Sequence, residues 1–304
     1  MKKILIFLFI VLFFMLYSDC GKKTEILSPD QQVTRLQFSL NGVNDPGSDA
    51  KYSMWAAYDS AKVPLTKFIG DFAIDGQGNA TPNAFDVKLG TVQKTTTFVT
   101  SVEHADSTPQ EASTHKILAA KLVANSGTFS VSDEYLLDFD EAMATGFYQV
   151  IQATGSDSVK GIWFMIGDTA REAGLGLPEA AAGWTYAGYV RINGSTYSTG
   201  DFYNPAAPDA GNPFNFSLPT FPFPGENFEI NPADSTNLNL DLRGAQVMIK
   251  ITPPLPNFAE APYDLIMFEG TIPMDATENV IYQLDNTSES FPHGNAQLII
   301  KMFE

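Results

Sequence analysis

The stretch VTRLQFSL at residues 33–40 decides the fold class, because its apolar and polar side chains alternate with a period of two. This period is typical of a β-strand that has one buried and one solvated face. Residues 97–102, TFVTSV, repeat the pattern with β-branched and aromatic side chains. The side chains that we expect to face a core are Leu36, Phe38, Leu40, Phe98, Thr100 and Val102.

Turn-forming pairs separate such stretches along the chain. Examples are NG at 41–42, DG at 75–76 and NG at 193–194. Gly and Asn tolerate positive φ, which tight hairpin turns require. Short strands with frequent turns and few long amphipathic segments favour an antiparallel β-sandwich of the immunoglobulin-like kind. The expected fold class is therefore all-β.

The chain also contains an internal repeat. Four pairs of segments follow one another in the same order: 52–55 with 186–189, 70–72 with 200–202, 98–102 with 247–251, and 146–151 with 294–299. Several matching segments in one order indicate an internal duplication. We expect two tandem β-sandwich domains at residues 33–154 and 155–304, joined by a small polar linker at 154–158.

Composition excludes some classes of protein. The chain has 304 residues, of which 44% are hydrophobic and 17% are charged, so it can bury a core in each of two domains. Its net charge of −17 repels polyanions, and no cluster of Lys and Arg offsets that charge. Nucleic acid is therefore not an expected partner.

The N-terminal residues resemble the export signal of a bacterial lipoprotein. An apolar run at 4–17 follows two lysines and is shorter than the ~20 residues of a membrane-spanning helix. The single cysteine, Cys20, comes next, although Asp19 stands where such signals carry a small residue. The resemblance implies that residues 1–19 are a signal peptide, that Cys20 is lipidated, and that residues 20–32 form a tether. We expect a lipid-anchored protein of the bacterial cell envelope, at the outer membrane or cell surface.

No catalytic constellation stands out. The sequence has no Gly-x-Ser-x-Gly elbow, His-Glu-x-x-His pair, phosphate loop or dinucleotide fingerprint. His104 and His115 flank a Pro-containing loop with acidic neighbours, but a solvated loop is the better interpretation because no third metal ligand is specified. The acidic run at 133–141 lacks calcium-loop spacing and favours a solvated helix face. We expect no enzyme activity, metal or cofactor.

The most unusual segment spans residues 204–232 and holds seven Pro and five Phe. Proline disfavours a central strand and favours an extended course from which aromatic side chains project. Either the rings fold back to cap the second domain or the cleft between the two domains, or they form an exposed patch for a protein, glycan or peptide ligand. The candidate binding residues are Phe214, Phe216, Phe221, Phe223 and Phe228. Trp55, Trp163 and Trp184 are expected in the core.

A family resemblance rests on Tyr52-x-x-Trp55, GDF at 70–72, a strand at 99–103 and the Pro-containing turn after it. This pattern resembles the extracytoplasmic C-terminal domain of anti-sigma-K factors, over most of residues 33–304. The resemblance implies a membrane-linked β-sandwich. We expect a non-enzymatic binding or structural module of the envelope. The resemblance alone suggests the alternative, a sensory or regulatory envelope component.

Overall fold

Strands dominate the structure, which is a computed structural model that describes residues 33–60, 63–132, 136–137, 139–257, 259 and 261–300. The helices in these residues are three short ones: α2 (Leu89–Val92), η1 (Glu141–Met143) and η2 (Ser288–Ser290). The antiparallel sheets curve into a half-barrel and a nearly closed barrel. The expected all-β, antiparallel class is confirmed. The predicted signal peptide, Cys20 and tether lie outside the described residues.

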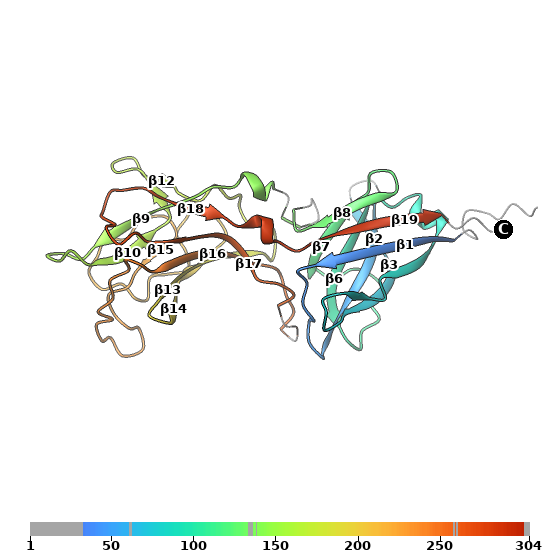
Figure 1. Cartoon of the computed structure of the whole chain (residues 1–304), viewed down its shortest axis with the longest axis horizontal. Coiled ribbons are helices and arrows are strands. Elements are labelled where there is room, and N and C mark those ends of the chain that lie inside the picture. The colour runs from blue at the N-terminus through green and yellow to red at the C-terminus, as the bar shows by residue number, and fades with distance from the viewer. Residues whose placement is uncertain are drawn as a thin grey trace, which may run out of the picture.

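Two large sheets lie side by side along the long axis of the molecule (Figure 1). In the described residues, the order of the first sheet is β4 (Ala80–Thr81), β3 (Val63–Ile74), β2 (Ala50–Ser60), β6 (Thr97–His104), β7 (Lys116–Lys121), β8 (Ser126–Ser130), β19 (His293–Ile300), β1 (Val33–Asn41) and β5 (Ala84–Lys88). The order of the second is β14 (Ser195–Phe202), β13 (Thr185–Ile192), β16 (Gln246–Thr252), β17 (Leu265–Thr271), β18 (Tyr282–Asn286), β9 (Gly146–Gln152), β10 (Val159–Trp163) and β15 (Gly225–Asn227). A small sheet pairs β11 (Met165–Ile166) with β12 (Glu172–Ala173). We call each large sheet with its connections a lobe.

The last strand of the chain lies in the first lobe, not in the second. β19 pairs antiparallel with β1, which places Leu36 opposite Leu298, and its other edge pairs with β8. Conversely, β9 lies in the second lobe between β18 and β10. The expected division near residue 154 therefore does not separate the two sheets, because each lobe contains one strand from the other half of the chain.

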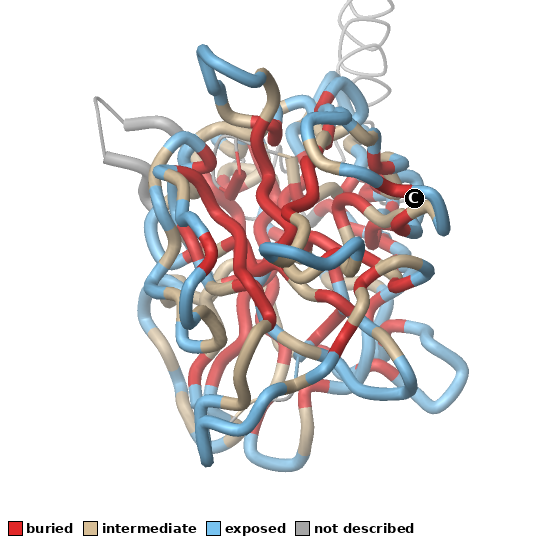
Figure 2. The backbone as a smooth tube through the Cα atoms, turned by 90° about the vertical axis from the view of Figure 1, so that its left-hand side faces the viewer, coloured by how far each residue is buried: buried red, intermediate tan, exposed pale blue. Residues whose placement is uncertain are grey.

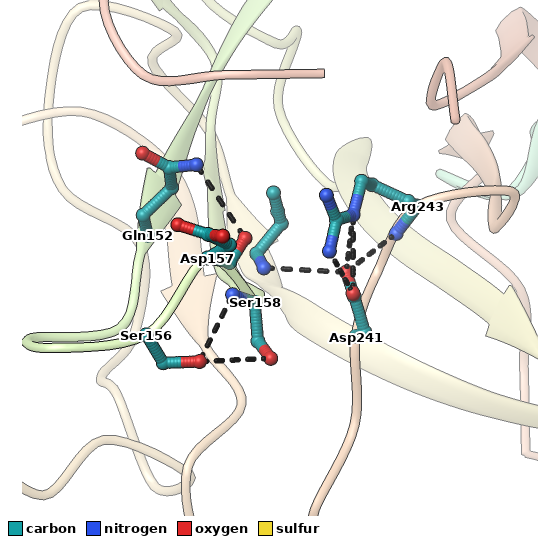
Figure 3. A network of polar contacts seen from close by, with 7 residues as sticks. Gln152, Ser156, Asp157, Ser158, Asp241 and Arg243 are labelled. Atoms are coloured by element: carbon teal, nitrogen blue, oxygen red, sulfur yellow. Dashed lines mark hydrogen bonds and ion pairs between the residues drawn. The ribbon is translucent and has the colours of Figure 1, made fainter. Parts of the chain in front are cut away.

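The expected linker at 154–158 is a hairpin turn (Figure 3). The N–H of Ala153 donates to the carbonyl oxygen of Ser158 at 2.8 Å, and the N–H of Ser158 donates to Oγ of Ser156 at 3.1 Å. Asp241 supports the turn from the side by accepting the N–H of Val159 at 3.2 Å. Small polar residues suit a turn as well as a linker. A hairpin keeps both of its strands in one sheet, so β9 stays with β10.

The two large sheets share the same strand order over eight neighbouring positions of the described chain. The order β3-β2-β6-β7-β8-β19-β1-β5 in the first corresponds to β14-β13-β16-β17-β18-β9-β10-β15 in the second. The four segment pairs found in the sequence occupy equivalent positions in these orders. The strands β9 and β19, which match in sequence, also match in position although they lie in opposite lobes.

One cluster of buried apolar side chains contains residues of both lobes. In a view along the long axis, the buried segments lie mainly inside and the exposed ones mainly at the rim (Figure 2). Phe38 of the first sheet and Ile249 of the second belong to the same cluster of buried apolar side chains. The six side chains predicted to face inward are all buried, and so are the three tryptophans. The alternation of apolar and polar residues therefore predicted the buried face of β1 correctly, whereas β6 is buried on both faces from Thr97 to Glu103.

The connection between β16 and β17 packs against the first lobe. Oη of Tyr263, which is 5% exposed, donates to the carbonyl oxygen of Ile117 at 2.8 Å. The N–H of Asn44 donates to the carbonyl oxygen of Pro262 at 2.7 Å. Burial raises the pKa of Tyr263 well above its usual range, so its hydroxyl stays protonated and can donate. Since these contacts join the lobes, we expect both lobes to unfold together.

The substitution Tyr263→Phe tests the contact between the lobes. It removes the donor to a buried carbonyl oxygen and should lower the free energy of unfolding by about 1–3 kcal/mol. Urea unfolding followed by circular dichroism measures the change. Tyr203→Phe is the control, because Tyr203 is 59% exposed and its loss should change nothing. Two separate transitions in the parent chain would contradict the shared core.

Candidate functional site

The five candidate phenylalanines do not share one surface. Phe223 and Phe228 are buried, Phe214 and Phe221 are half-buried, and only Phe216, at 78%, is largely exposed. The structure therefore does not present the expected patch of five exposed rings. Most of the segment instead caps the second lobe.

The rings of this segment lie on two sides of the second sheet. Phe214 and Phe228 pack together in the main core, with ring centroids 5.3 Å apart. Phe221 and Phe223 pack in a separate apolar cluster around Trp163, and the Phe221 ring meets the indole edge-on at 5.1 Å. The guanidinium of Arg171 lies 4.4 Å from the centroid of the Phe221 ring. Prolines keep most of this segment out of the sheet, so its aromatic side chains help to hold it in place beside the short pairing of β15 with β10.

One carboxylate binds three consecutive backbone N–H groups of this segment. Glu229 accepts the backbone N–H groups of three consecutive residues at 2.6–3.0 Å: Phe216, Ser217 and Leu218. Desolvation raises the pKa of Glu229, but these donors together outweigh it and bring the pKa below its usual range. The ionised carboxylate therefore stabilises the turn at 216–218.

A second carboxyl group in the segment is buried. Glu226 of β15 is 0% exposed, and desolvation raises its pKa to about 7, with a further contribution from Asp209. The N–H of Asn227 donates to its Oε1 at 2.8 Å and opposes that shift. Glu226 is thus about half ionised near neutral pH. Within the described residues, no group of three His, Cys, Asp or Glu side chains could hold a metal ion.

The histidines do not gather into a site. The Nδ1 atom of His104 accepts the N–H of Asp106 at 3.3 Å. The Nδ1 atom of His115 lies 3.0 Å from the carbonyl oxygen of Pro254, in the other lobe. His293 lies in β19, with Nδ1 3.1 Å from the carbonyl oxygen of Phe291. His104 and His293 thus bond within their own segments, whereas His115 contacts the connection between β16 and β17.

A cavity of about 450 Å³ lies on the outer face of the first sheet, where the connection between β6 and β7 covers β2 and β3. We call it the β3 cavity. Its lining combines two aromatic rings with hydroxyl, amide and charged groups: Tyr58, Thr66, Lys67, Phe68, Asp71, Ser107, Thr108, Pro109 and Gln110. This mixture is typical of sites that bind small polar molecules. The sequence analysis did not identify it.

The loop over the β3 cavity is fastened to the sheet at three points. Nζ of Lys51 donates to the carbonyl oxygen of Ser107 at 2.7 Å. The N–H of Ala112 donates to Oγ1 of Thr66 at 3.1 Å, and the N–H of Ser113 donates to Oε1 of Glu103 at 3.1 Å. These bonds hold the roof of the cavity in place without a ligand, which lowers the entropy lost on binding.

The charged groups of the cavity already have partners. Asp71 pairs with Lys51 at 2.9 Å and accepts the hydroxyl of Ser53 at 2.6 Å. Lys67 donates to Oγ1 of Thr91 at 3.0 Å. The lining itself carries one carboxylate, Asp71, and one ammonium group, Lys67, so its formal charges cancel. The arrangement favours a neutral ligand with hydroxyl groups over an ion.

An aromatic ring is accessible in this neutral cavity. Phe68 is 41% exposed and packs edge-on against buried Trp55, with ring centroids 5.4 Å apart. The pairing of β2 with β3 shifts register between Gly70 and Phe68, so a bulge sets the direction of this ring. A bulge cannot be located from alternation in a single strand, which explains why the sequence analysis missed Phe68.

A second hollow, of about 620 Å³, lies over β7, β8 and β19. Its lining is made of small and polar side chains, among them Thr128, Ser130, Asn295 and Gln297. No aromatic ring lines it. Because its apolar lining is limited to Ala119, Val123 and Ala296, it offers less to a small molecule than the β3 cavity does.

Comparisons of the chain with known protein families, curated proteins and solved structures found no match. The resemblance to the anti-sigma-K domain thus stays a prediction from short motifs. None of the helices in the described part of the chain has the length and hydropathy needed to cross a membrane. A functional proposal for this chain therefore rests on the geometry of the β3 cavity and on the sequence.

The substitution Glu226→Gln tests the buried carboxyl group. Folding raises its pKa from about 4.5 to about 7, so its stabilising effect is complete below pH 4.5 and is lost as pH rises through 7. The variant should be more stable than the parent by about 3 kcal/mol at pH 8 and equal to it near pH 4. Thermal or urea unfolding across this pH range measures the difference.

Glu229→Gln is the matched control with the opposite sign. Its pKa is lowered by folding, so its stabilising effect is present above the unfolded pKa and is lost as pH falls. This variant should be less stable than the parent at pH 8. Equal pH profiles for the two variants would show that burial does not distinguish the two carboxyl groups.

Proposed function

We propose that this protein is a non-enzymatic, lipid-anchored binding module of the cell envelope, and that its ligand is a neutral saccharide. The observation that carries the proposal is the exposed ring of Phe68 in a cavity whose charged groups, Asp71 and Lys67, already have an ion-pair or hydrogen-bond partner. A sugar ring stacks its C–H face on an aromatic side chain, while its hydroxyl groups bond to polar side chains. Gln110 and Thr108 in the covering loop supply such groups.

The fold supports the anchoring part of the proposal. Thr34 pairs with Ile300, so both ends of the described chain leave the first lobe at the same end, away from the second lobe (Figure 1). A lipid on Cys20, with a tether at 20–32, would then place the first lobe next to the membrane and the second lobe farther out. The long axis of the molecule would then point away from the membrane.

The shared strand order supports an origin by duplication. We infer that both lobes derive from one immunoglobulin-like sandwich domain. The eight matching positions in the two sheets and the four matching sequence segments favour this origin over chance. After the duplication, the second lobe gained the Pro- and Phe-rich segment at 204–232, and most of the phenylalanine rings of this segment are now at least half-buried.

The substitutions Phe68→Ala and Gln110→Ala test saccharide binding. Loss of the ring should weaken binding of a neutral oligosaccharide about ten-fold, because an aromatic contact of this kind contributes about 1.5 kcal/mol. An array of neutral oligosaccharides identifies the probe, and calorimetry with that probe measures the affinity. Gln110 is exposed, so its substitution leaves the fold intact.

Phe216→Ala is the matched control for this experiment. Phe216 is an exposed ring outside the cavity, and its loss should leave the affinity unchanged. The proposal fails if no neutral oligosaccharide binds the parent chain. It also fails if Phe68→Ala and Gln110→Ala bind the probe as the parent does.

The substitution Cys20→Ala tests the lipid anchor independently of the ligand. Without the thiol no acyl chain can be attached, so the variant should move from the detergent phase to the aqueous phase in a partition experiment. The parent chain expressed in the same cells is the control. Equal partitioning of both chains would contradict lipidation at Cys20.

A further inference from the structure

The first lobe has a slot between β1 and β8 that the C-terminal strand fills. β19 pairs with residues 34–41 of β1 along one edge and with residues 126–129 of β8 along the other. Without β19, both neighbours would expose rows of unpaired N–H and C=O groups at an open edge. The slot is therefore a site for one β-strand.

The slot is shaped for the side chains of β19. Ala296 and Leu298, which are 1% and 5% exposed, point into the core, and a Cβ on Gly294 would lie 2.1 Å from the carbonyl oxygen of Ser39. The equivalent strand β9 carries Tyr148 where β19 carries Ala296. A tyrosine would overfill that position. Residues 293–300 are thus the fitting occupant, whichever chain supplies them.

Only a short connection joins β19 to the second lobe. All strands of the second lobe lie in one stretch of the sequence, between residues 146 and 286. Residues 287–292 then connect β18 to β19. This connection includes η2, where Oγ of Ser288 donates to the carbonyl oxygen of Glu141 at 3.4 Å. Opening it would release β19 while every other strand pairing of both sheets stays intact.

From this arrangement we propose that the slot between β1 and β8 is an interaction surface for a second copy of this chain, and that two chains form a dimer by exchanging β19. In the dimer each slot receives the same eight residues, so the hydrogen bonds and the buried apolar surface of β19 itself are the same as in the monomer. The two states differ in the connection at 287–292 and in the entropy of association. The dimer is therefore favoured at high protein concentration.

The order of synthesis favours exchange during folding. β19 is the last described strand to be made, so the first lobe keeps an open slot until residues 293–300 are complete. A neighbouring chain at the same stage offers an identical strand. Once two such chains have exchanged β19, they can separate only if each β19 loses its pairing with both β1 and β8. The dimer therefore persists.

A disulfide between two different chains tests the exchange. Gln37 of β1 and Gln297 of β19 are exposed and lie opposite each other, and paired positions on neighbouring strands are close enough for a disulfide. One Cys20→Ala chain carries Gln37→Cys and another carries Gln297→Cys. The two are unfolded together, refolded at increasing concentration and oxidised. A covalent dimer, which only exchange can bring together efficiently, should appear and increase with concentration.

Two controls make the result interpretable. A single chain with both cysteines should close within itself at low concentration, which verifies the pairing. A mixture of the Gln37→Cys chain with a Gln77→Cys chain measures random collision, because Gln77 lies in the turn between β3 and β4. Exchange should give about ten-fold more covalent dimer than this mixture, through the higher effective concentration of the paired thiols. Equal yields in the two mixtures, or a double variant that fails to close, would overturn the proposal.

Discussion

The pairing of β19 with β1 is the constraint on which the rest of the structure depends. A strand in the middle of a sheet must have partners for its N–H and C=O groups on both edges, and β1 and β8 cannot supply them to each other at this distance. The end of the chain therefore returns across the whole second lobe to complete the first. This return joins the two ends of the described chain and makes the two lobes parts of one folded unit.

The same requirement explains how the segment at 204–232 is held. Its prolines lack N–H groups and keep most of it out of the sheet, apart from β15, so carboxylates accept several of its remaining N–H groups. Glu229 does this close to solvent and keeps a low pKa, whereas Glu226 does it in the core and has a pKa near 7. The stability of the second lobe thus depends on pH in opposite directions at two neighbouring carboxyl groups.

The β3 cavity shows how a ligand site can arise on such a scaffold without new structural elements. Strand curvature and one bulge turn Phe68 outward, and a loop fastened by Lys51, Thr66 and Glu103 covers it. Lys51, which holds the loop through the carbonyl oxygen of Ser107, also forms an ion pair with Asp71 on the floor of the cavity. A stable roof over a neutral floor favours a neutral polar ligand, which is the basis of the proposed function.

The sequence by itself determined the all-β class, the buried face of β1 and the matching segments, because each of these depends on local alternation and turn chemistry. It also provided the N-terminal export pattern and Cys20, which lie outside the described residues. Only the tertiary structure decided that β9 and β19 lie in opposite lobes, that four of the five phenylalanines are at least half-buried, and that Phe68 lines a cavity. The physical reason is that strand partners, burial and register shifts depend on residues far apart in the chain. A hairpin turn at 154–158 and a domain linker have the same composition, and only the pairing of the strands beside it separates the two.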